Sequence, residues 1–334
     1  MCTAMTLQDK QRVNFFGRTM DFSFDIDPNL YIVPRGYKWD NIINMEPIHN
    51  PYSFIGIGQQ VDGLLGFFDG VNEKGFAAAA LYFAGYAKYD SIAQNKEITR
   101  NQIVSFDLLH YFLGHCTSVE ELQEMVRKIS IIGMPDPVTQ TIAPLHWIAV
   151  DHKGKCVVIE QTKKGLEVFN NPIGVMANSP DFQWHMTNLR NYMEVSPKQV
   201  SEAAWGDVVL KPFGQGGGTV PLPGGYTAPE RFVRTAYLKT HIPAPTNQSN
   251  AVTSCFHIME SVSIPKGAVL TDRDTYDYTR YTAFMDLSTC EYFFKTYDNI
   301  QVGTARLYPE YAQSNELTNL GSINQPIKFE AICS

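Results

Sequence analysis

Short apolar runs and turn residues alternate along the first hundred positions, and this pattern predicts β structure. Apolar runs at 54–58 and 66–68 precede a turn at 72–75, and the apolar segment 76–83 follows that turn. Short runs bounded by glycine and asparagine are typical of strands. We therefore expect the N-terminal part of the chain to supply strands to a sheet.

The middle of the chain changes to a helical spacing. Apolar side chains along 104–127 recur on one face of a helix, and Ser118 with Glu121 forms a capping box that starts a second helix there. Further helices are predicted at 182–192, 230–239 and 251–261, and further strands at 145–150, 157–161, 292–294 and 302–307. Strands at both ends with helices between them favour a layered α+β fold in which both terminal parts join central sheets.

No linker divides the sequence, so we expect one domain over residues 2–334. The segment 213–229 is rich in Gly and Pro, but it is short and apolar, which predicts an ordered loop. Its glycine run at 214–218 lacks the Gly-Lys-Ser/Thr ending of a phosphate loop. No internal repeat is present.

Composition and charge narrow the class of protein. With 334 residues, 44% of them hydrophobic, the chain can bury a substantial core, and its net charge of −7 argues against a nucleic-acid partner. The N-terminus lacks the apolar segment of a secretory signal, and no apolar stretch reaches the ~20 residues that span a bilayer. We expect a cytoplasmic protein, whose six scattered cysteines, Cys2 apart, are inert thiols.

Cys2 is the first candidate for chemistry. If Met1 is removed, one residue carries a thiol nucleophile and a free α-amine that can act as its base, which suffices for acyl transfer. A nearby Arg18 would stabilise the thiolate, and a carboxylate at Asp21 could accept a hydrogen bond from the amine. Position alone also fits a cysteine without a role at the chain terminus.

Motifs spread along nearly the whole chain resemble the choloylglycine hydrolase family, which includes penicillin V acylases and conjugated bile-salt hydrolases. The similar segments are 2–3, 17–22, 69–75, 80–83, 144–147, 174–180, 213–216, 222–224, 229–234, 264–267 and 297–299. Because they follow in order, they are more specific than any single motif. The resemblance implies an N-terminal nucleophile hydrolase with a four-layer αββα fold, in which two antiparallel sheets lie between helical layers.

The resemblance also implies roles for several side chains. Asn178, in the family's Asn-x-Pro motif, would donate to the oxyanion formed when an amide carbonyl is attacked, and the backbone N–H of Tyr82 would be the second donor. Arg231 matches a buried active-site arginine, which would lie beside Asp21 or the thiolate. From the residues alone, Asn178 also fits an Asx turn, and Arg231 a solvent-exposed charge.

Histidines offer a rival site. His115 adjoins Cys116, and His257 lies on the helix of Cys255, but neighbours on one helix point apart, so neither pair predicts a Cys–His dyad. His146 lies on an apolar strand and fits a core histidine. No zinc-binding spacing occurs, so we expect neither a metal nor a cofactor.

We interpret the chain as a linear-amide hydrolase of the penicillin V acylase type. Tyr82 favours this substrate, because bile-salt enzymes of the family commonly carry Asn at the matching position. A conjugated bile salt and an N-acyl homoserine lactone are the alternative substrates. Like penicillin V, both are small N-acyl amides. A ligand-binding protein that retains the fold and Met1 is the non-enzyme alternative. By resemblance we expect a homotetramer, with the loop 196–229 available for assembly.

Overall fold

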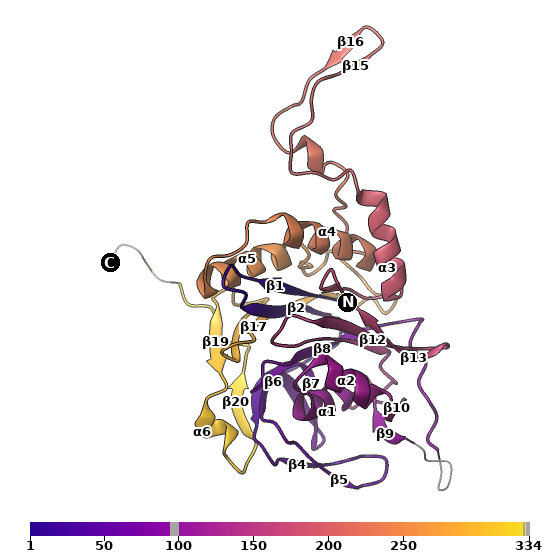
Figure 1. Ribbon diagram of the computed structural model, residues 1–334, viewed down its shortest axis with the longest axis vertical. Coiled ribbons are helices and arrows are strands. Elements are labelled where there is room, and N and C mark those ends of the chain that lie inside the picture. The colour runs from indigo at the N-terminus through magenta and orange to yellow at the C-terminus, as the bar shows by residue number, and fades with distance from the viewer. Residues whose placement is uncertain (94–99, 330, 332–334) are drawn as a thin grey trace.

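Two antiparallel sheets face each other and carry helices on their outer sides (Figure 1). This computed structural model describes residues 1–93, 100–329 and 331. Strands from the start and from the last quarter of the chain enter both sheets. The expected four-layer α+β fold is therefore confirmed.

The six-stranded sheet contains the N-terminal strand. Its order is β14 (Val175–Met176), β1 (Cys2–Gln8), β2 (Asn14–Phe22), β17 (Tyr278–Asp286), β18 (Glu291–Thr296) and β19 (Gly303–Arg306). Nearly every residue of β1 and β2 is buried. A strand that is covered on both faces lacks the alternation of polar and apolar residues, which is why the pattern did not mark these two strands.

The eight-stranded sheet contains most of the predicted strands. Its order is β13 (Gly165–Asn170), β12 (Cys156–Thr162), β11 (Leu145–Val150), β8 (Ala77–Tyr82), β7 (Leu64–Asn72), β6 (Phe54–Val61), β3 (Asn29–Val33) and β20 (Thr318–Ser322). The predicted turn lies between β7 and β8, where Gly75 has a φ of 72°, a conformation that favours glycine.

Helices cover both outer faces. They are α1 (Leu108–His115), α2 (Val119–Val126), α3 (Phe182–Asn188), α4 (Ala228–His241), α5 (Gln248–Glu260) and α6 (Pro309–Ala312). The helix predicted from residue 104 begins only at Leu108, because 101–104 form β9 (Asn101–Val104), which pairs in parallel with β10 (Ile129–Ile132). Ser118 caps α2 as expected, accepting from the Glu121 N–H at 3.2 Å.

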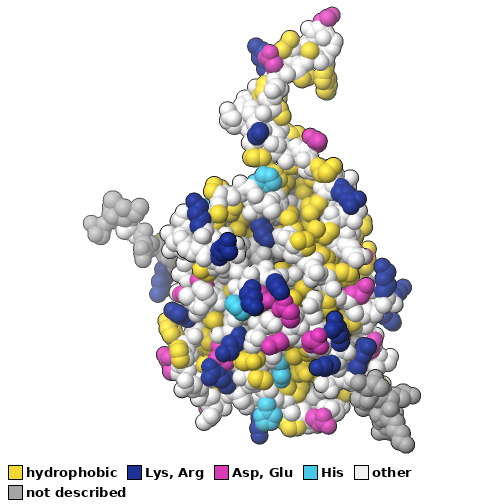
Figure 2. Space-filling view, viewed as in Figure 1, with side chains coloured by type: hydrophobic (Ala, Val, Ile, Leu, Met, Phe, Trp, Pro, Cys, Tyr) yellow, Lys and Arg dark blue, Asp and Glu magenta, His cyan; other side chains and the backbone are white. Residues whose placement is uncertain are grey.

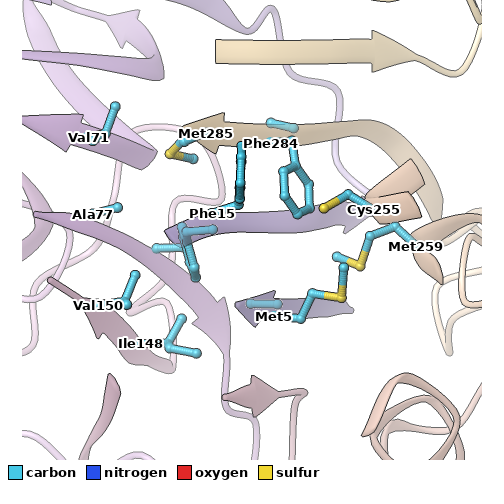
Figure 3. Close-up of a cluster of buried hydrophobic side chains, with 14 of the residues drawn as sticks. Met5, Phe15, Val71, Ala77, Ile148, Val150, Cys255, Met259, Phe284 and Met285 are labelled. Carbon is cyan, nitrogen blue, oxygen red and sulfur yellow. The ribbon is translucent and has the colours of Figure 1, made fainter. Parts of the chain in front are cut away.

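The core is continuous from one sheet to the other. Figure 3 shows Val71 and Ile148 of the eight-stranded sheet on one side, and Met285 of the six-stranded sheet turned toward them, whereas Phe284 points the other way. On the far side of the six-stranded sheet, α5 adds Met259 to the same cluster. A second buried cluster lies between the eight-stranded sheet and the helices α1 and α2.

An arm projects from this body between α3 and α4 (Figure 1). It ends in a hairpin of β15 (Ala203–Trp205) and β16 (Val208–Leu210), which the sequence pattern did not predict. Another hairpin, β4 (Lys38–Asp40) and β5 (Pro47–His49), lies at the opposite end of the molecule. Across the described residues, no helix has the length and apolar character needed to cross a membrane.

Candidate active site

Cys2 is buried at the start of β1, and the strand register brings Arg18 to its thiol. Cys2 pairs with Met20 of β2, and alternate residues of a strand share a face, so Arg18 faces the same side as Met20. The Arg18 Nη2 atom lies 2.8 Å from the Cys2 Sγ atom. Burial disfavours the charge of Arg18, but the nearby Cys2 thiol, Tyr281 and Asp69 outweigh burial and raise its pKa. Arg18 is therefore a fixed cation beside the nucleophile candidate.

The backbone around Cys2 is held by polar groups. The Cys2 N–H donates to the Asn178 Oδ1 atom at 2.7 Å. The Met1 ammonium donates to the Asp21 carbonyl at 2.6 Å and forms an ion pair with Asp277 at 3.1 Å. The sequence pattern gave no sign of Asp277, which comes from the opposite end of the chain.

Asp21 lies on β2 with its carboxylate fully buried. Its Oδ1 accepts from the Thr279 hydroxyl at 2.6 Å and its Oδ2 from the Thr19 hydroxyl at 3.2 Å. Burial raises the pKa of Asp21, although Arg231, whose Nη1 lies 3.8 Å from Oδ2, favours the charged form. The Cys2 nitrogen donates to Asn178 instead, so the expected bond from that nitrogen to Asp21 is not formed while Met1 is attached.

Asn178 follows β14 and connects Cys2 with Tyr82. Its Nδ2 donates to the Tyr82 carbonyl at 2.7 Å, which leaves a second amide hydrogen. Its own carbonyl accepts from the His185 Nε2 at 2.7 Å. Burial lowers the pKa of His185 to about 4, so the ring is neutral near pH 7 and carries its proton on Nε2. His185 thus anchors the turn that carries Asn178.

Arg231 is completely buried on α4. It donates to the Cys2 carbonyl at 2.6 Å, to the Thr3 hydroxyl, and to the Asn178 Oδ1 at 2.7 Å. Arg234, one turn further on, is also buried and donates to loop carbonyls. The reading of Arg231 as an exposed charge is therefore wrong, because α4 packs its Arg231 side onto β1.

An apolar pocket opens beside Cys2. It encloses about 910 Å³ of empty space, including the part open to solvent, and Tyr82 forms part of its wall. Its other walls come from β2, β6, β7, β11 and the segments 105–109 and 136–143; among the apolar residues are Met20, Phe22, Phe67, Phe106, Leu109 and Trp147. A pocket with this lining fits an apolar acyl group.

The six predicted site residues thus lie together. The sequence did not single out the groups that support them, namely Asp69, Thr19, Thr279, Tyr281 and Tyr292. Asp69 and Thr19 fall within motif segments, but their contacts depend on pairing between distant strands. Nothing in the described part of the chain groups three or more His, Cys, Asp or Glu side chains as a metal site.

The histidines do not form the rival dyads. Cys255 is fully buried, whereas 76% of the His257 side chain is exposed. The His115 ring lies tilted against the Tyr111 ring of the same helix, with centroids 4.5 Å apart, and its Nδ1 atom is 2.9 Å from the Tyr111 carbonyl oxygen. His146 is buried against Glu160, as expected for a core histidine, with Nδ1 at 3.2 Å from Oε1.

Comparison with known proteins agrees with this architecture. Residues 2–319 match the profile of the linear amide C–N hydrolases, choloylglycine hydrolase family. A bile salt hydrolase/transferase of Clostridium perfringens is 35% identical over 318 residues, covering 95% of each chain. The crystal structure of a variant of conjugated bile acid hydrolase from Clostridium perfringens superposes with a TM-score of 0.91, at 32% identity, over 99% of this chain and 100% of the other.

A penicillin V acylase is a more distant relative. The enzyme of Pectobacterium atrosepticum is 25% identical over 320 residues, covering 88% of this chain and 78% of its own. The comparisons therefore favour the bile-salt alternative over the penicillin V interpretation that rested on Tyr82. The chain belongs to the choloylglycine hydrolase family of linear amide C–N hydrolases.

Proposed function

We propose that this protein hydrolyses the amide bond of conjugated bile salts, releasing the steroid acid and glycine or taurine. The observation that carries the proposal is the apolar pocket that opens at Cys2, because a steroid is a large apolar acyl group. The 35% identity to a bile salt hydrolase/transferase, against 25% to a penicillin V acylase, supports the same choice.

In the proposed mechanism, Met1 is removed and Cys2 becomes the N-terminal residue. Its α-amine takes the thiol proton, and the thiolate, stabilised by Arg18 at 2.8 Å, attacks the amide carbonyl. The C–N bond breaks, the protonated amine leaves, and a thioester remains. Water then attacks the thioester with the same amine as base, which releases the acid and restores the thiol.

The oxyanion would be bound between Asn178 and Tyr82. The second Nδ2 hydrogen of Asn178 and the backbone N–H of Tyr82 are the proposed donors. Arg231 supports this arrangement by holding the Asn178 Oδ1 atom at 2.7 Å, which turns the amide nitrogen toward Tyr82. Asp21 would balance the charge of Arg231 and orient the freed amine.

Penicillin V is the second candidate, because the Tyr82 ring lines the pocket and could stack on a flat phenoxyacetyl group. An N-acyl homoserine lactone is a third substrate of the same chemistry. The test measures kcat/KM for glycocholate, taurocholate, penicillin V and a long-chain N-acyl homoserine lactone on one preparation. The proposal requires a bile salt to be preferred by tenfold or more, and a preference for penicillin V overturns it.

We also propose that residues 2–334 act as one domain and assemble as a homotetramer through the arm. The arm presents exposed apolar side chains, which Figure 2 shows along its length; among them are Val200, Trp205, Val208, Val209, Phe213 and Val220. Apolar patches of this kind are typical of protein interfaces. Light scattering of the wild type and of Trp205→Ser tests assembly, and a monomeric wild type would contradict it.

A further inference from the structure

A buried carboxylate from the opposite sheet lies directly behind Arg18. Asp69 is on β7 of the eight-stranded sheet, whereas Arg18 belongs to β2 of the six-stranded sheet. Both side chains are completely buried, and the Arg18 Nη1 atom lies 3.4 Å from the Asp69 Oδ2 atom. This ion pair therefore crosses the core between the two sheets. The same Arg18 guanidinium that binds Asp69 through Nη1 contacts the Cys2 thiol through Nη2.

Two tyrosine hydroxyls hold this carboxylate in place. Tyr281 of β17 donates to Oδ2 of Asp69 at 2.6 Å, and Tyr292 of β18 donates to Oδ1 at 2.8 Å. Both rings are buried. Together with Arg18, three donors converge on one carboxylate, an arrangement that suits the ionised form. Burial opposes that form and raises the pKa of Asp69, so the three donors are what keeps a charge tolerable there.

All five N–H donors of Arg18 have acceptors, so its orientation is fully determined. The acceptors are the Thr19 carbonyl at Nε, the Phe68 carbonyl and Asp69 at Nη1, and the sulfur atoms of Cys2 and Met20 at Nη2. Among the described residues, Nη1 is bound only by β7, through Phe68 and Asp69. Because the guanidinium is planar and rigid, fixing Nη1 on β7 directs Nη2 to the thiol.

We propose that Asp69 is a positioning residue which, with Tyr281 and Tyr292, holds the Arg18 guanidinium against the Cys2 thiol. The inference rests on the proposed function in that it takes this thiol as the nucleophile. Asp69 acts through Arg18 and contacts neither the thiol nor the pocket. The ion pair thereby joins the two sheets at the point where Arg18 must stay in contact with the Cys2 thiol.

The test follows the pH dependence of Cys2 alkylation by iodoacetamide in the native protein, read by mass spectrometry of the N-terminal peptide. The variants are Asp69→Asn, which keeps the size of the side chain, and Tyr292→Phe, which removes one donor to Asp69. The matched control is Asp286→Asn, because Asp286 is a buried acid on the same strand as Tyr281 and accepts from the turn at 288–289 instead. The N-terminal residue of each preparation is identified in the same spectra.

In Asp69→Asn we expect the pH of half-maximal alkylation to rise by about one unit. A cation within about 3–4 Å of the thiol favours the thiolate, and in this variant the Arg18 guanidinium is no longer held there. The kcat/KM for the preferred amide should fall at least tenfold. Tyr292→Phe should shift both quantities in the same direction by less, and the Asp286→Asn control should match the wild type. If Asp69→Asn does not fold, Tyr292→Phe decides, because its effect must pass through Asp69.

Two outcomes overturn the proposal. A lower alkylation midpoint in Asp69→Asn would mean that Arg18 stays in place and that Asp69 only weakens its field. An unchanged midpoint in a folded variant would reduce Asp69 to a structural role. Alkylation reports the thiol without any substrate, so a wild type that hydrolyses no tested amide would refute the proposed function and leave this comparison decisive.

Discussion

The Arg231 guanidinium donates to the side-chain oxygen of Asn178, with Nη2 at 2.7 Å from Oδ1. The same oxygen accepts the Cys2 N–H at 2.7 Å. Two donors on Oδ1 leave no ambiguity about which end of the amide is nitrogen. Arg231 therefore connects α4 to the orientation of the proposed oxyanion donor, although it touches neither the thiol nor the pocket.

Arg231→Lys should lower kcat/KM by about 10²-fold, because an ammonium cannot reproduce three directed bonds from one planar group. Steady-state kinetics on the preferred amide measures the loss. The control is Arg234→Lys on the same buried face of α4, where the arginine serves the loop carbonyls of Pro223 and Gly225 and the Ser261 carbonyl. Equal losses in both variants would show that α4 is merely destabilised.

Cys2→Ser should lose nearly all amidase activity and fold normally, since a hydroxyl is a far weaker nucleophile with only an α-amine as base. Circular dichroism and an amide-hydrolysis assay measure the two properties. Cys290→Ser serves as control, because Cys290 donates to the Asn72 carbonyl at 3.1 Å and a serine can make the same bond. A form that retains Met1 behind an uncleaved tag should be as inactive as Cys2→Ser.

Asn178→Ala should reduce kcat by about 10²–10³-fold with little change in KM, as expected for a donor used in the transition state. The side chain also bonds the Cys2 N–H and the Tyr82 carbonyl, so thermal unfolding must be followed alongside kinetics. If KM rises while kcat is preserved, Asn178 binds substrate and the oxyanion role is wrong.

Glu160 makes stability depend on pH. It is buried, accepts from the Phe182 N–H at 3.0 Å, and burial raises its pKa from 4.5 to about 8. Between these values the folded state holds a proton that the unfolded state has released, so the free energy of unfolding falls as pH rises from about 4.5 to about 8.

In Glu160→Gln this loss should disappear. The variant should match the wild type in urea unfolding near pH 5 and exceed it near pH 8.5, by an amount on the order of a few kcal/mol. Glu124→Gln, at an exposed position of α2, should keep the wild-type pH dependence. A parallel decline in the wild type and Glu160→Gln would place the titrating group elsewhere.

The sequence allowed the local elements and the fold to be predicted, but the contacts between sheets were out of reach. Strands β6, β7, β8 and β11 carried their own turn signals, and the motifs around Cys2 and Asn178 identified the fold. In contrast, Asp69 meets Tyr292 over 223 positions of sequence. No local pattern marks which buried tyrosine pairs with which carboxylate, because that choice depends on how the two sheets are stacked.

Two errors have similar physical origins. Residues 104–107 were assigned to the helix because their apolar spacing fits a helix, but residue 104 ends the strand that pairs with β10 and 105–107 form the turn before α1. Tyr82 was given decisive weight for substrate choice, although it is one part of a pocket wall built from strands of both sheets and two further segments. Substrate preference is a property of that whole wall.

Tyr82→Asn provides a direct measure of how much that single ring contributes. The ring lies edge-on to Phe22 with centroids 6.4 Å apart and lines the pocket beside Cys2. Removing it should raise the ratio of kcat/KM for glycocholate over that for penicillin V, because the variant loses an aromatic surface for the phenoxy group. The expected change is about 10-fold, as for one aromatic contact.

Since the Asn178 bond uses the Tyr82 carbonyl, which any residue supplies, the oxyanion geometry should survive. A matched Tyr86→Asn change, at a more exposed ring outside the pocket, should leave the ratio unaltered. If Tyr82→Asn also leaves the ratio unaltered, Tyr82 acts through its backbone alone and the rest of the wall sets the preference.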